Sequence, residues 1–130
     1  MVRSAIAVVD DMFFVSKIRA TGKALGMIVK FPRTLEALRE SINDEAPNLI
    51  IVDLHNTKVE PIKLANELKQ SESSRDIPLL GFFSHVQSEL QRNALAAGYD
   101  EVLPRSLFAR DLAHVLAGQI KNKQNEEADR

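Results

Sequence analysis

The sequence of 130 residues has no cysteine, no tryptophan, one tyrosine, and only five glycines and five prolines. Without cysteine, disulfides, zinc–thiolate sites and thiol catalysis are all excluded. An excess of charge of one sign is also missing: 17 Lys and Arg face 18 Asp and Glu, so the formal net charge is -1. This balance gives no electrostatic reason to expect direct binding to nucleic acid or to a membrane surface.

Long apolar runs are missing as well. The first run ends at Asp10 and is too short for a signal-peptide core or a membrane span. We therefore expect a soluble, cytoplasmic protein. The length and a hydrophobic fraction of 45% predict one globular domain with its own core.

Short apolar runs alternate with longer amphipathic stretches along the chain. Continuous apolar runs bounded by polar or turn residues are typical of strands that are buried on both faces. The predicted strands cover residues 5–9, 27–31, 49–52, 77–83 and 99–103.

Helices are predicted between and after these strands by apolar spacing and by end signals. Gly26 and Gly98 stand where a helix C-terminal glycine is expected, Thr34 and Ser106 where an N-cap is expected, and Pro61 at a first helical position. One continuous last helix, carrying Phe108, Leu112, Val115 and Ile120, is expected.

Five strands alternating with five helices predict an α/β fold: a three-layer, doubly wound (βα)5 sandwich around a parallel sheet. The domain is expected over residues 4–119, followed by a polar tail or linker stub over 120–130.

Polar side chains follow four of the predicted strands. Asp10 and Asp11 follow the first strand, Asp53 the third, Ser84 the fourth, and Arg105 comes shortly after the fifth. Parallel strands all end at one edge of the sheet, where open α/β sheets bind ligands. If the first and third strands are neighbours, the three carboxylates converge there.

Three converging carboxylates repel one another unless a cation is present, and their oxygen-only chemistry suits Mg²⁺. A metal beside Asp53 would let its carboxylate attack a phosphoryl group in line, while Ser84 and Arg105 donate to the phosphoryl oxygens. Taken singly, each residue has a plainer interpretation: a helix cap, a turn or a surface charge. The functional interpretation is favoured because all of these residues follow strands that end at the same edge of the sheet.

Several motifs together resemble a response-regulator receiver domain over most of the chain. They are IAVVDD at 6–11, PNLIIVDL at 47–54, IPLL at 77–80, AGYDE at 97–101 and PRS at 104–106. The resemblance implies a flavodoxin-like sheet with strand order 2-1-3-4-5.

The same resemblance implies roles for individual residues. Asp53 would be the phosphoacceptor, Asp11 a direct Mg²⁺ ligand and Asp10 a ligand through water, with the backbone carbonyl of His55 completing the protein ligands. Ser84 would supply the hydroxyl that moves to the phosphoryl group on activation.

The implied function is that of a phosphorylatable signalling switch rather than a conventional enzyme. A sensor histidine kinase or a phosphotransfer protein would supply the phosphoryl group, and the receiver would catalyse its own phosphorylation and slow dephosphorylation. A downstream protein or an output domain would receive the signal. A stand-alone receiver and a fragment of a larger regulator are both compatible with the sequence.

Three departures from the family pattern are visible. Arg105 stands where lysine is usual, and its planar guanidinium is not equivalent to an ammonium. Val102 stands at the position of the usual switch aromatic. The loop after Asp53 reads HNTKVE over 55–60, instead of the usual proline- and glycine-bearing turn.

These departures leave alternatives open. The main one is a pseudo-receiver, a phosphorylation-independent protein-interaction module. A flavodoxin-like redox protein is disfavoured because carboxylates after the first strand would repel a flavin phosphate. His55 and His85 are interpreted as rim residues rather than metal ligands or proton shuttles. Phe13 and Phe14 are either both core residues, which we favour, or one of them is an exposed partner-binding anchor.

Overall fold

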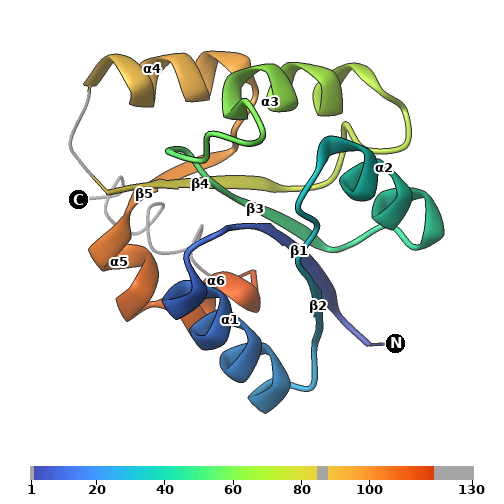
Figure 1. Cartoon of the computed structure of the whole chain (residues 1–130), viewed down its shortest axis with the longest axis vertical. Helices are drawn as coiled ribbons and strands as arrows, with labels where there is room; N and C mark the ends of the chain where they lie inside the picture. Colours follow the sequence, from blue (N-terminus) through green and yellow to red (C-terminus); the bar gives the residue numbers. More distant parts are fainter. Residues whose placement is uncertain (1, 85–87, 119–130) are drawn as a thin grey trace, which may run out of the picture.

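The computed structural model describes residues 2–84 and 88–118, and within them the chain forms one parallel sheet covered by helices on both faces (Figure 1). The sheet order is β2-β1-β3-β4-β5, and every neighbouring pair is parallel. This confirms the predicted class and order. In chain order the elements are β1 (Ser4–Val8), α1 (Met12–Ala24), β2 (Ile28–Lys30), α2 (Leu35–Asp44), β3 (Leu49–Asp53), α3 (Pro61–Gln70), β4 (Leu79–Phe83), α4 (Ser88–Ala97), β5 (Glu101–Pro104), α5 (Arg105–Arg110) and α6 (Leu112–Leu116).

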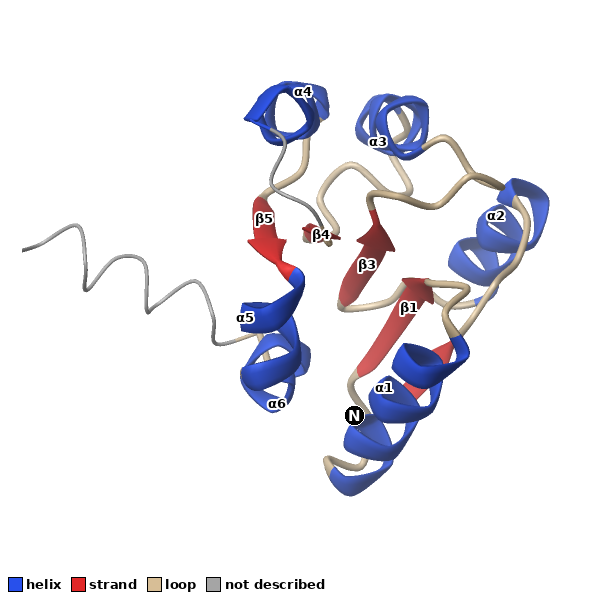
Figure 2. Cartoon of the chain, turned by 60° about the vertical axis from the view of Figure 1, so that its left-hand side comes forward, coloured by secondary structure: helices blue, strands red, loops and turns tan. Residues whose placement is uncertain are grey.

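Two hydrophobic clusters separate the three layers, because successive side chains of a strand point to opposite faces of the sheet. In β3, Ile51 packs with α1, α5 and α6, whereas Ile50 and Val52 pack with α2, α3 and α4. Figure 2 shows the same division, with the helices in two groups on either side of the strands. A sheet that is buried on both faces requires apolar side chains at both the odd and the even positions of its strands.

Helix ends follow the predicted signals in most places. The Thr34 hydroxyl accepts a hydrogen bond from the Ala37 N–H at 3.0 Å, so Thr34 is the N-cap of α2. Pro61 is the first residue of α3. Gly26 has a φ of 71°, the left-handed conformation that glycine adopts beyond a helix end.

The last helix differs from its prediction. Ser106 is not its N-cap: α5 begins at Arg105, and Pro104, whose ψ is 147°, takes the cap position without a side-chain hydrogen bond. Proline suits this place because its fixed φ is compatible with the extended backbone before a helix. The helix is then divided at Asp111, with φ -103° and ψ 23°, into α5 and α6. The expected apolar position at Ile120 lies outside the described residues.

The fourth strand also starts later than predicted. It begins at Leu79, after Pro78, rather than at Ile77. Proline has no N–H to donate to a neighbouring strand, but its carbonyl still accepts from Ile50 N at 2.9 Å. Pro78 therefore lies just before the first residue of β4 and not inside the strand.

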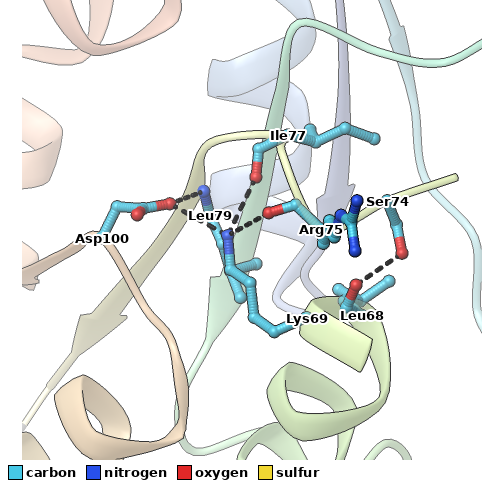
Figure 3. Close-up of polar contacts among 7 residues, drawn as sticks. All are labelled: Leu68, Lys69, Ser74, Arg75, Ile77, Leu79 and Asp100. Carbon is cyan, nitrogen blue, oxygen red and sulfur yellow. Dashed lines mark hydrogen bonds and ion pairs between the residues drawn. The ribbon is translucent and has the colours of Figure 1, made fainter. Parts of the chain in front are cut away.

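A polar network at the amino-terminal edge of the sheet holds β4 in place (Figure 3). Lys69 Nζ, at the end of α3, lies 3.3 Å from Asp100 Oδ2 and also donates to two backbone carbonyls of the α3–β4 loop. Asp100 Oδ2 accepts a second hydrogen bond from Leu79 N at 2.8 Å. The buried Ser74 hydroxyl donates to Leu68 O at 2.7 Å. These contacts fix the start of β4, whose other end reaches the predicted site.

No helix among the described residues combines the length and the apolar character needed to cross a membrane.

Candidate functional site

The residues predicted to act together lie at the carboxyl-terminal edge of the sheet. β1 and β3 are neighbours, with Val8 opposite Val52, so Asp10 and Asp11 follow β1 beside the end of β3 at Asp53. On the other side of β3, the pairing of β4 with β5 ends at Phe83 and Pro104. Ser84 and Arg105 therefore start from the same edge, as predicted.

Asp53 is half-buried, and its own loop orients its carboxylate. Oδ1 accepts a hydrogen bond from the backbone N–H of His55 at 2.9 Å, and the Asp53 carbonyl accepts one from Asn56 N at 3.0 Å. Across residues 2–84 and 88–118, Oδ2 accepts no hydrogen bond. One carboxylate oxygen thus fixes the side chain, and the other remains available for chemistry.

Both carboxylate oxygens of Asp11 are engaged. Oδ1 caps α1 by accepting from Phe13 N at 2.9 Å and Phe14 N at 3.3 Å, and Oδ2 accepts from Arg105 Nη2 at 3.0 Å. Burial raises the pKa of the Asp11 carboxyl, but the hydrogen bonds from Phe14, Arg105 and Phe13 outweigh it, so the pKa lies below its ordinary value. Asp11 is therefore held as a carboxylate.

Arg105 makes a second contact at the same place. Its Cζ atom lies 4.4 Å from the centroid of the Phe14 ring, so the guanidinium lies over the face of that ring while it binds Asp11. A planar guanidinium can hydrogen-bond through its edge and stack through its face, which a lysine ammonium cannot do.

The loop after Asp53 provides another cation. Lys58 Nζ lies 3.6 Å from Asp10 Oδ2, and both side chains are exposed. The loop is a tight turn, because Asn56 Oδ1 accepts from Lys58 N at 2.8 Å and from Val59 N at 3.1 Å. Val59 is buried. The HNTKVE segment thus forms its turn through an asparagine side chain rather than through proline and glycine.

The acidic residues fit Mg²⁺ in chemistry but do not form a ready-made site. Carboxylate and carbonyl oxygens are the ligands that Mg²⁺ prefers. In the part of the chain that the structure describes, however, no three His, Asp or Glu side chains are grouped closely enough to hold a metal ion. Asp10 and Asp11 each pair with a cation of the chain instead. An ion bound at Asp11 would compete with Arg105 for its carboxylate.

The remaining predicted residues are distributed around this edge. Ser84 is exposed at the end of β4, His55 is half-buried in the loop after β3, and His85 lies outside the described residues. Val102 is half-buried and packs toward the side of α3 and α4. The roles proposed for these residues stay predictions.

The two phenylalanines after the acidic pair have different environments. Phe14 is buried at 2% exposure, whereas Phe13 is 70% exposed, so the prediction that both belong to the core is wrong. Phe13 occupies the first turn of α1, whose opposite side packs on the sheet. The buried stripe of α1 starts at Phe14 and continues through Val15 and Ile18, so Phe13 lies outside it.

Sequence reasoning missed two contacts of the site. One is the pairing of Lys58 with Asp10, and the other is the position of Arg105 over Phe14. The second joins residues that are far apart in the sequence, and no local pattern marks it. The lysine five residues after Asp53 was visible in the loop, but its direction depends on the turn that Asn56 makes.

Comparison with known proteins shows likeness in structure only. No protein-family model matches the sequence, and no curated protein matches it in sequence. Among solved structures, a CheY-like response-regulator receiver domain protein from Methanospirillum hungatei has a TM-score of 0.78 at 17% identity, covering 97% of this chain and 99% of that one. The chemotaxis response regulator CheY4 of Vibrio cholerae also gives 0.78 at 17% identity, with coverages of 92% and 99%.

The phosphorylated cyanobacterial phytochrome response regulator RcpA gives a TM-score of 0.74 at 15% identity, covering 91% of each chain. At such identities the likeness establishes the fold alone. The chain has the receiver-domain fold of response regulators.

Proposed function

We propose that this chain is a phosphoacceptor receiver of a two-component signalling system, in which Asp53 is phosphorylated with the help of Mg²⁺ and the change switches an interaction with a partner. The observation that carries the proposal is the position of Asp53 at the end of β3, next to the acidic pair that follows β1. A sensor histidine kinase or a phosphotransfer protein would be the phosphoryl donor, and a downstream protein or an output domain would receive the signal.

In the proposed reaction the free oxygen of the Asp53 carboxylate attacks the phosphorus of a donor phosphohistidine. A P–O bond to Asp53 forms while the P–N bond breaks, and the electron pair of that bond returns to the imidazole nitrogen, which takes up a proton. His55 N–H holds the other oxygen of Asp53 so that the attacking one keeps its direction.

Mg²⁺, when bound, would neutralise the charge that gathers on the phosphoryl oxygens. Asp10, Asp11, Asp53 and the backbone carbonyl of His55 are the oxygen ligands available for it at this edge. Arg105 is already beside Asp11 and can donate to the phosphoryl group, as can the exposed Ser84 hydroxyl.

A second candidate function is a pseudo-receiver that binds partners without phosphorylation. The specific observation in its favour is the pairing of Asp10 with Lys58 and of Asp11 with Arg105, which balances two of the three acidic charges without a metal. A valine at position 102 also leaves the usual switch aromatic missing.

Titration with Mg²⁺ and beryllofluoride, followed by backbone NMR, separates the two candidates. A phosphoacceptor receiver should show saturable shifts around Asp53, Ser84 and Arg105 that are absent in Asp53→Asn. Asp76→Asn is the matched control, because Asp76 is an exposed aspartate in the α3–β4 loop at the opposite sheet edge. No response in the unaltered protein would reject the phosphoacceptor and leave the pseudo-receiver.

A chemical test complements the titration. Incubation with acetyl phosphate and Mg²⁺ should add one phosphoryl group, detected by intact-protein mass spectrometry, and Asp53→Asn should prevent it. Phosphorylation that persists in Asp53→Asn would place the acceptor elsewhere.

A further inference from the structure

Arg105 is held between two side chains of different chemistry, and both belong to the start of α1. Nη2 lies 3.0 Å from Asp11 Oδ2, and Cζ lies 4.4 Å from the centroid of Phe14. The Arg105 side chain is 40% exposed, so water screens its pairing with Asp11 and that pairing alone holds the guanidinium weakly. The Phe14 ring is buried and fixed, and it therefore provides the rigid half of the arrangement.

Phe14 is part of a buried cluster of three rings. Its centroid lies 5.3 Å from that of Phe82 and 5.7 Å from that of Phe108, and Phe82 and Phe108 stack at 4.5 Å with planes 5° apart. All three rings are almost completely buried. Rings packed this closely leave little room for one of them to shift without affecting the others.

The three rings come from elements that each begin or end at a residue of the proposed site or next to one. Phe14 lies in the first turn of α1 after Asp11, Phe82 lies in β4 two residues before Ser84, and Phe108 lies one turn along α5 from Arg105. A displacement of the Arg105 side chain therefore acts on the Phe14 ring, whose neighbours are Phe82 in β4 and Phe108 on the buried side of α5.

We propose that Phe14 is a positioning residue that holds Arg105 at the acidic site, and that the rings of Phe14, Phe82 and Phe108 couple the Arg105 guanidinium to the buried side of α5. Val102, which stands at the position of the usual switch aromatic, packs on the opposite face of the sheet from these rings. An arginine serves this arrangement because its guanidinium binds Asp11 and covers Phe14 at once, whereas a lysine would keep only the charge. The positioning role is independent of phosphorylation; the coupling to α5 rests on the proposed function.

When Arg105 turns from Asp11 toward a phosphoryl group on Asp53, it uncovers the face of Phe14. The environment of the ring cluster then changes, and Phe108 reports the change on α5. Without the ring contact, a cation at position 105 can reach the phosphoryl group, but its side chain no longer touches the cluster and only the backbone of α5 joins it to Phe108.

The positioning role is tested by NMR of the full chain without metal. Arg105 side-chain signals should show the ring-current shift of a group over an aromatic face, and Phe14→Leu should remove it. The ratio of Asp11-bound to released Arg105, measured by the exchange of its Nη2–H protons, should fall roughly two- to fivefold in Phe14→Leu. An unshifted Arg105 signal in the unaltered protein overturns the positioning role.

The coupling is tested with Arg105→Lys, which keeps the charge at a partly exposed position and should fold. At saturating Mg²⁺ and beryllofluoride, the unaltered protein should shift the Phe108 ring signals. Arg105→Lys should also reach saturation, with an affinity of its own, but should shift Phe108 several-fold less. Arg19→Lys is the matched control, because Arg19 lies over the Phe31 ring at 4.8 Å, outside the cluster. It should retain the Phe108 response.

The outcomes separate the two hypotheses. A Phe108 response in Arg105→Lys as large as in the unaltered protein overturns the coupling and leaves the proposed function intact. No binding at all in the unaltered protein rejects both the proposed function and the coupling, and the ring-current measurement without metal then decides the positioning role by itself.

Discussion

Replacing Gly81 by alanine should destabilise the fold from the centre of the sheet and disturb the candidate site. Gly81 lies in β4 between Leu79 and Phe83 on the face that packs against α3 and α4. A Cβ added there would lie 2.8 Å from Leu54 Cδ2 and 3.1 Å from Tyr99 Cδ1. Carbon atoms in packed cores keep about 3.5–4.0 Å between them, so both buried side chains must retreat by roughly 0.5–1 Å.

The expected magnitude follows from two opposing effects. Overpacking a core by one methyl group costs about 1–3 kcal/mol. Alanine recovers about 0.5–1 kcal/mol, because the unfolded chain with glycine has more conformational freedom to lose. We expect a net loss of roughly 0.5–2 kcal/mol in the free energy of unfolding. Since Leu54 follows Asp53 directly, the response to Mg²⁺ and beryllofluoride should weaken as well.

Urea unfolding followed by tyrosine fluorescence measures this directly. Tyr99 is the only tyrosine and the chain has no tryptophan, so the signal comes from a ring that the new methyl group contacts. Adding Leu54→Val should restore part of the stability, because it removes a methylene group from the crowded space. Gly26→Ala is the control: nothing lies within 4 Å, so its cost comes from the φ of 71° and its folded-state Tyr99 signal should not change.

The reasoning would be refuted by a Gly81→Ala protein as stable as the unaltered one. It would equally be refuted if the effects of Gly81→Ala and Leu54→Val were simply additive, since two side chains that compete for one space must be coupled.

Three further predictions concern the loop after Asp53 and the single tyrosine. Lys58→Met should raise the affinity for Mg²⁺ in an NMR titration, because Lys58 no longer competes for Asp10; an unchanged affinity would show that their exposed ion pair has no effect on the site. Asn56→Ala should lower the free energy of unfolding by about 1–2 kcal/mol, as two backbone N–H groups lose their acceptor; a neutral result in urea unfolding would contradict this. Burial raises the pKa of Tyr99, whose hydroxyl donates to Pro61 O at 2.8 Å, so the fold prefers the neutral phenol. Stability should therefore be complete below the ordinary tyrosine pKa of about 10 and fall as pH rises above it, and tyrosinate absorbance should appear only as the protein unfolds; ionisation of the folded protein at the ordinary pKa would refute this.

Local pattern in the sequence was enough to predict the elements of the fold. The run at 49–52 is apolar at every position and ends at Asp53, so both the buried strand and the carboxylate at its end could be predicted. Periodicity of this kind does not predict the order of the strands in the sheet. We predicted that order from the resemblance to receiver domains. The start of α5 was misplaced because Ser106 looks like a cap in isolation, whereas Pro104 already takes the cap position and the helix begins at Arg105.

The edge of the sheet on which the polar residues gather was also decided by the sequence, because parallel strands all end on one side. The pairs that form there were decided by tertiary structure. Arg105 reaches Asp11 across 94 residues of sequence, and it meets the ring of Phe14, whose neighbour Phe13 points to solvent. Periodicity and end signals are properties of neighbouring residues, so the chain shows them locally. Contacts between distant side chains depend on how the layers pack, and only the folded sheet and helices bring Arg105, Asp11 and Phe14 to one place.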